Sequence, residues 1–123
     1  MAPRRRIPVA AGRGAVEAWR AGVESGAAVD RTTLATAVRY ALEELGTRAP
    51  GRSVEVRVPP FGAVQCIEGS THTRGTPPAV IETDAATWLA LATGSLAWDD
   101  ALSSGALQAS GERADLTHLL PLV

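Results

Sequence analysis

The chain has 123 residues, of which 46% are hydrophobic and 20% charged, and its net charge is −1. This length fits a single soluble domain, and the near-neutral charge offers no general attraction to nucleic acid or to an anionic membrane surface. The single cysteine excludes an internal disulfide, and no apolar run approaches the roughly 18 residues that a membrane-spanning helix requires.

The N-terminal segment is basic and then mildly apolar. Its apolar run, 7–12, is interrupted by Pro8 and is too short for the hydrophobic region of a secretory signal peptide. We therefore expect residues 1–12 to be a flexible N-terminus, residues 13–123 to form one domain, and the protein to be cytoplasmic. The three arginines at 4–6 are too few to indicate nucleic acid binding.

Two helices are predicted before the first strand. The segment 14–22 is short, whereas 30–46 has the clearest helical periodicity in the chain. Asp30 suits an N-terminal cap, and Gly46 lies where a helix end favours a left-handed residue. The apolar residues of this second helix form one stripe, namely Leu34, Val38, Ala41, Leu42 and Leu45.

The pattern then changes from helical spacing to alternation. Residues 53–58 alternate valine with polar side chains, which is typical of a half-buried strand. After a turn at 59–62, residues 63–67 are predicted to form a second strand and an antiparallel hairpin with the first. A polar loop, 68–78, leads to a third predicted strand at 79–82.

Two further helices are predicted at 83–94 and 95–105, each ending at a glycine. Thr83 and Asp84 form a candidate pair of N-terminal caps for the first of them.

The last predicted elements are a strand at 106–110 and one or two helical turns within 111–120. Together the elements predict an α+β domain in which helices cover one face of a mainly antiparallel sheet.

Side chains that could carry chemistry are few and scattered. Cys66 alternates inward within a strand and is expected to behave as a small hydrophobe, while no motif supports a nucleophilic pair with His72. His118 is predicted to lie at the surface. Asp99 and Asp100 are adjacent on a helix, so their side chains point in different directions and cannot bind one metal ion together. We expect them to interact favourably with the helix dipole as acids of the first turn. We expect no catalytic residue, no metal site, no cofactor and no enzyme activity.

The polar loop is the one segment whose side chains suggest a ligand-binding role. His72, Thr73 and Arg74 offer donors for an anionic or hydroxylated head group. The alternative is an ordinary long hairpin loop, whose polar side chains bond to its own backbone.

Two runs of sequence carry a family resemblance. The first, WLALATGSLAWDDALSSGALQASGERADLTHLLPL, contains an apolar helix ending in TGSL, an alanine-rich helix, and then GALQASG before a closing apolar segment. It resembles the C-terminal signature of the sterol carrier protein-type lipid-binding family. The second, VEVRVPPFGAVQCIEGSTHTRGTPPAVIETD, resembles a bacterial, largely actinobacterial, branch of that family.

The resemblance implies a sterol carrier protein-like fold: a mainly antiparallel sheet of about five strands, with helices on one side enclosing a hydrophobic tunnel. It further implies non-enzymatic binding of a sterol, a fatty acid or an acyl-CoA-like lipid. Residues expected to line or gate the tunnel are Val56, Phe61, Val64, Cys66, Trp88, Leu91, Trp98, Leu102, Leu107 and Leu119.

Two other interpretations remain open. In one, the core is closed and the chain is an accessory domain that packs against a partner protein or, as a homodimer, against a second copy of itself. In the other, the chain is an enzyme-associated module, although its two histidines are too few for the metal site of such enzymes. Neither interpretation includes contact with the membrane interior or with nucleic acid.

Overall fold

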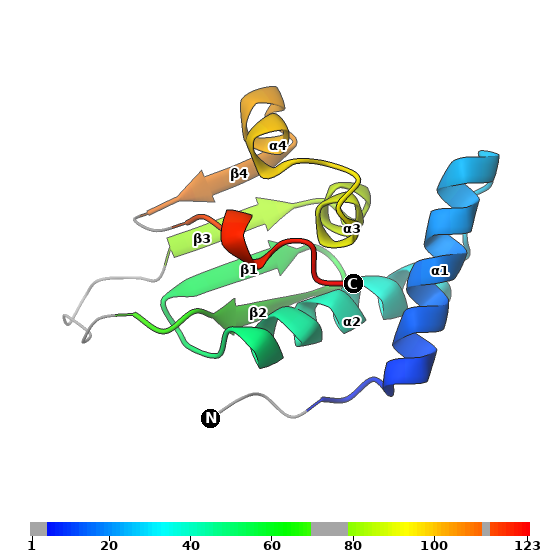
Figure 1. Cartoon of the computed structure of the whole chain (residues 1–123), viewed down its shortest axis with the longest axis horizontal. Coiled ribbons are helices and arrows are strands. Elements are labelled where there is room, and N and C mark those ends of the chain that lie inside the picture. The colour runs from blue at the N-terminus through cyan, green and yellow to red at the C-terminus, as the bar shows by residue number, and fades with distance from the viewer. Residues whose placement is uncertain (1–4, 70–78, 112–113) are drawn as a thin grey trace.

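The computed structural model describes residues 5–69, 79–111 and 114–123, and these form an α+β fold (Figure 1). The predicted fold class is therefore confirmed. In chain order, the elements are α1 (Val9–Ser25), α2 (Arg31–Arg48), β1 (Val54–Val58), β2 (Gly62–Cys66), β3 (Ala79–Thr83), α3 (Ala85–Thr93), α4 (Trp98–Ser104), β4 (Leu107–Ser110) and a short 3-10 helix, η1 (Thr117–Leu119).

The sheet has the strand order β2-β1-β3-β4. The β1–β2 and β3–β4 pairs are antiparallel, whereas β1 and β3 run parallel, with Val54 opposite Ala79. The described residues thus form a mixed sheet of four strands, where about five mainly antiparallel strands were expected. The difference arises because β3 adds to the free side of β1 instead of extending the hairpin beyond β2.

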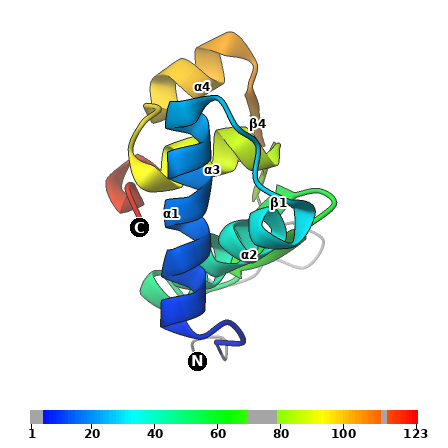
Figure 2. The same ribbon diagram turned by 90° about the vertical axis from the view of Figure 1, so that its right-hand side faces the viewer.

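Helices α2 and α3 cover one face of this sheet, and α1 packs against α2 on the side away from the strands (Figures 1 and 2). Alternation in β1 explains the arrangement, since Val54, Val56 and Val58 are fully buried beneath the helices while Arg57 is exposed. Among the described helices, none combines the length and the apolar character needed to cross a membrane.

Several predicted helix ends are confirmed. Asp30 and Asp84 accept hydrogen bonds from the backbone N–H groups of Thr33 and Thr87, at 2.7 and 2.8 Å. Glycines 94 and 105 both adopt left-handed conformations at the ends of α3 and α4, with φ of 85° and 81°.

Two other predicted caps are wrong. Gly46 is buried inside α2, which continues to Arg48 and stops only before Pro50, a residue with no N–H to donate. Thr83 does not cap α3. It belongs to β3, is buried, and donates its hydroxyl to the Ala106 carbonyl at 2.8 Å.

The first helix is longer than the sequence predicts. It begins at Val9 instead of residue 14, so residues 9–12 are helical where a flexible segment was expected. The physical reason is tertiary contact. Gly12 is buried against Tyr40 of α2, and Glu43 of α2 accepts hydrogen bonds from the backbone N–H of Ile7, at 3.0 Å.

The described part of the C-terminal segment, 114–123, contains less helix than expected. Instead of one or two helical turns, it has the three residues of η1, after which Pro121 directs the chain into an extended end. The backbone N–H of Leu122 donates to the carbonyl of Ala92 in α3, at 2.8 Å. The segment thereby buries Leu116 and Leu122 and closes the core on that side.

Candidate functional site

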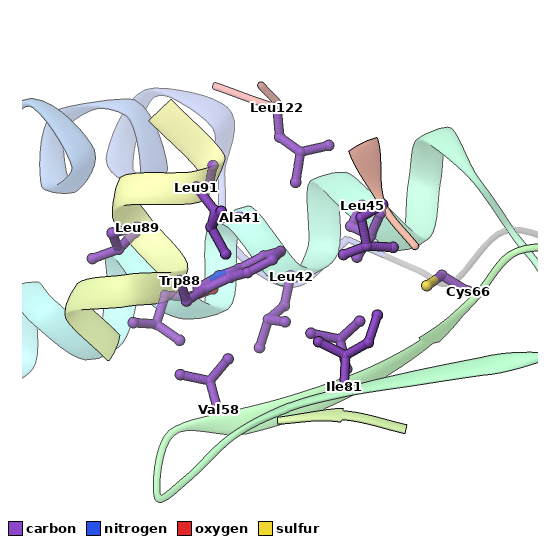
Figure 3. Close-up of a cluster of buried hydrophobic side chains, with 14 of the residues drawn as sticks. Ala41, Leu42, Leu45, Val58, Cys66, Ile81, Trp88, Leu89, Leu91 and Leu122 are labelled. Atoms are coloured by element: carbon purple, nitrogen blue, oxygen red, sulfur yellow. The ribbon is translucent and has the colours of Figure 1, made fainter. Parts of the chain in front are cut away.

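The interior between the sheet and helices α2 and α3 is the apolar region in which a ligand tunnel was expected. Figure 3 shows Trp88 of α3 above the sheet residues Val58 and Ile81, with Leu42 of α2 on the sheet side of its ring and Leu122 of the C-terminal segment above. Each of these side chains is at most 3% exposed, so the described interior is a packed apolar core.

Trp88 is the largest of the fully buried side chains. Its indole Nε1 donates a hydrogen bond to the Val38 carbonyl of α2, at 3.3 Å. A buried indole N–H without an acceptor is costly, so this contact fixes the ring's orientation as well as satisfying its polar atom. The bond also ties α3 to the middle of α2.

Cys66 ends β2 and is fully buried, as predicted for a small hydrophobe. Burial raises the pKa of its thiol to about 11, so the thiol is protonated at neutral pH and is a poor nucleophile. His118 is exposed in η1, as predicted, and Asp99 and Asp100 lie in the first turn of α4. The described side chains include no group of three that could hold a metal ion.

The residues expected to line or gate a tunnel fall into three groups. Leu102 is 40% exposed and does not join the core. Partly buried and packed against the core are Phe61, Val64 and Leu119. Buried within it are Val56, Cys66, Trp88, Leu91, Trp98 and Leu107.

Phe61 and Trp98, the two expected gate residues, lie toward opposite edges of the sheet. Phe61 lies in the turn between β1 and β2, close to α2. Trp98 opens α4, which contacts β4 at the other edge of the strand order. The structure therefore does not bring these two aromatic rings together at one entrance.

Several core residues were absent from the predicted lining. Ile81 shares the inward alternation of β3, a signal that was available in the sequence AVIE. Leu116 and Leu122 were harder to place, because they reach the core from a segment with almost no regular structure. Among the buried members missed in this way are Ile81, Leu89, Leu116 and, at 2% exposure, Leu122.

Two hollows among the described residues lie on the surface. One, of about 250 Å³, is bordered by α2 and the β1–β2 turn. Its lining is Arg31, Thr32, Ala35, Thr36, Arg39, Pro60 and Phe61. The other, of about 270 Å³, lies between the ends of β1, β3 and α4 and is lined by Pro59, Glu82, Thr83, Asp84, Gly105, Ala106 and Gln108.

Neither hollow is lined by Trp88 or by the leucines around it. The predicted head-group residues His72, Thr73 and Arg74 lie outside the described residues.

Comparison with known proteins identifies the family. No curated protein matches the sequence. Residues 30–122, which run from the cap of α2 to the buried Leu122, match the family described as the bacterial SCP ortholog. This match covers the whole sheet and the helices that pack on it, and leaves α1 outside. The chain therefore belongs to the bacterial SCP ortholog family.

Proposed function

We propose that the protein is a non-enzymatic lipid-binding protein that takes a sterol, a fatty acid or an acyl-CoA-like lipid between its sheet and its helices. The observation that carries the proposal is the family match over residues 30–122, since membership of the SCP family suggests lipid binding in general. The apolar interior described above supports it, because a lipid chain needs a dry, apolar environment.

Ligand entry requires the interior to open. The side chains that fill it come from separate elements, so a lipid chain can replace some of them only if one covering element moves. The C-terminal segment is one such covering element, and its described regular structure is the three residues of η1. Among the described residues, its end is attached through Leu122 and Val123, whose N–H groups share the Ala92 carbonyl.

Two leucine truncations test this arrangement. Leu122→Ala removes a side chain that fills the interior, which lowers the cost of admitting a ligand. Leu102→Ala makes the same chemical change at an exposed position. In a titration with a fluorescent fatty acid, we expect several-fold tighter binding by Leu122→Ala and wild-type affinity for Leu102→Ala.

Native mass spectrometry of the freshly purified protein gives an independent test of the proposal. It should detect a co-purified lipid, which solvent extraction then identifies. Failure to find a bound lipid, together with no uptake of the fluorescent fatty acid by wild type or by Leu122→Ala, would falsify the proposed function.

The packed interior favours one second candidate, an accessory domain with a closed core that docks against a partner or another copy of the chain. Val9 and Val23 on α1 are the large apolar side chains that such a contact would cover, at 41% and 62% exposure. Analytical ultracentrifugation distinguishes the candidates. A concentration-dependent oligomer without lipid uptake supports the accessory domain, whereas a lipid-loaded monomer supports the lipid-binding protein.

A further inference from the structure

The hollow beside Phe61 has a lining that the lipid-binding interior does not explain. It lies along the first half of α2, where Arg31, Ala35 and Arg39 follow one another at helical spacing, and it is closed on the other side by Pro60 and Phe61. Its volume of about 250 Å³ is sufficient for a small polar group. Two arginines and two threonines make it strongly polar.

Arg39 is held in place by the turn opposite it. Its Nε donates a hydrogen bond to the Phe61 carbonyl at 2.8 Å. A guanidinium has five N–H donors, and the two terminal nitrogens of Arg39 have no acceptor among the described residues. One end of the side chain is thus fixed, while four donors are left at the hollow.

Arg31 approaches the same turn from the start of the helix. Its guanidinium carbon lies 5.3 Å from the centre of the Phe61 ring, which places the charge over the aromatic face. In the described part of the chain, neither Arg31 nor Arg39 has a carboxylate oxygen within 4.0 Å.

The neighbouring carboxylates are engaged elsewhere. Asp30 accepts from the Thr33 N–H at 2.7 Å, and Glu43, one turn beyond Arg39, accepts from the N–H groups of Arg6 and Ile7 at 3.1 and 3.0 Å.

The threonines complete the lining. Thr36 donates its hydroxyl to the Thr32 carbonyl at 2.9 Å, which leaves the oxygen of Thr36 as an acceptor. No described residue bonds the hydroxyl of Thr32, which therefore remains available as a donor. The positive charge of the hollow comes from Arg31 and Arg39, and the threonine hydroxyls add a donor and an acceptor beside it.

We propose that this hollow binds a phosphate monoester group. Two guanidinium groups on the α2 wall of the hollow, one over the Phe61 ring and one bonded to the Phe61 carbonyl, match the several oxygens and the double charge of phosphate. Arginine is the side chain best suited to binding phosphate. The phosphate comes from one of two sources, a free phosphate ester or the head group of a lipid. Because Phe61 also packs against the core, an alkyl chain on the phosphate would leave the hollow toward the apolar interior.

The test compares three probes by calorimetric titration at low ionic strength: inorganic phosphate, dodecyl phosphate and dodecanol. The test variant is Arg31→Gln/Arg39→Gln. The matched control is Arg13→Gln/Arg52→Gln, which removes the same number of charges from exposed positions outside the hollow. Circular dichroism confirms that both variants fold. NMR shifts at the amides of Thr32, Thr36 and Phe61 locate the bound phosphate.

We expect the test variant, and not the control, to bind dodecyl phosphate about tenfold more weakly than wild type. If inorganic phosphate also binds in an arginine-dependent way, the free phosphate group is sufficient. If only dodecyl phosphate binds in an arginine-dependent way, the phosphate group belongs to a lipid head group. This assignment rests on the proposed lipid-binding function. The proposal is overturned if both variants bind equally well, or if wild type binds neither phosphate probe.

Dodecanol separates this proposal from the lipid-binding function. Equal binding of dodecanol and dodecyl phosphate by all three proteins would overturn the phosphate site and leave lipid binding intact. Arginine-dependent binding of inorganic phosphate, without uptake of dodecanol or of the fluorescent fatty acid, would support the phosphate site and contradict the lipid function.

Discussion

Cys66 is the residue whose chemistry is most altered by the fold. Its thiol has an ordinary pKa of 9.0, which burial raises to about 11. Well below pH 9 the thiol is protonated in both the folded and the unfolded chain and contributes no pH dependence. Between pH 9 and 11 the unfolded chain loses its proton first, so the free energy of unfolding falls as the pH rises.

This behaviour is testable with Cys66→Val, which keeps an apolar side chain of similar size in the core. Urea unfolding below pH 9 and near pH 11 should show that wild type loses about 2 kcal/mol more stability than the variant over this interval. Parallel pH profiles for the two proteins would mean that Cys66 is accessible to water in the folded state.

At the scale of elements, the docking of α1 on α2 depends on one glycine. A Cβ atom on Gly12 would lie 2.1 Å from Cδ1 of Tyr40, whereas a Cβ on Gly14, in the same helix, would meet no atom within 4 Å. The two positions are therefore a matched pair. They share the same helix and the same substitution, and differ in the contact.

We expect Gly12→Ala to displace α1 from α2 and to destabilise the fold by about 1–3 kcal/mol. Gly14→Ala should instead stabilise it by about 0.5–1 kcal/mol, because alanine favours the helical backbone. Urea unfolding curves measure both values. The interpretation fails if the two variants change stability in the same direction and by the same amount.

The elements that could be predicted from the sequence are those with local signals. Alternating valines placed β1, and the side chains of Asp30 and Asp84 placed the starts of α2 and α3. Left-handed glycines marked the ends of α3 and α4. These signals act within a few residues, so they are visible without knowledge of the tertiary structure.

The features that the sequence did not reveal depend on distant contacts. The early start of α1 follows from Tyr40 and Glu43, and the position of Leu122 depends on Ala92. The same holds for the site. Arg31 and Arg39 recur on one side of α2, but only the folded chain shows Phe61 facing them across a hollow.

For the whole molecule, lipid binding has a thermodynamic consequence that a closed core lacks. A ligand that binds only the folded state stabilises it, by about 3 kcal/mol when the free ligand is at about one hundred times Kd. Urea unfolding with and without a saturating fatty acid should therefore show a higher midpoint with the ligand. An unchanged midpoint at saturating ligand would favour the closed accessory domain.

The parallel pairing of β1 with β3 also bears on the order in which the chain folds. Helix α2 and the β1–β2 hairpin form one half of the fold from neighbouring sequence, and β3, α3, α4 and β4 form the other. Among the described strands, the β1–β3 ladder is the only one that joins these halves. Only the β1–β2 hairpin pairs residues close in sequence, such as Val58 with Gly62, whereas Val54 pairs with Ala79 in the β1–β3 ladder and Val80 with Ser110 in the β3–β4 ladder. We therefore expect the hairpin to form first and the two ladders of β3 to form later. Formation of the central β1–β3 ladder, which includes Ile81 and lies beneath Trp88, would then commit the chain to its native topology.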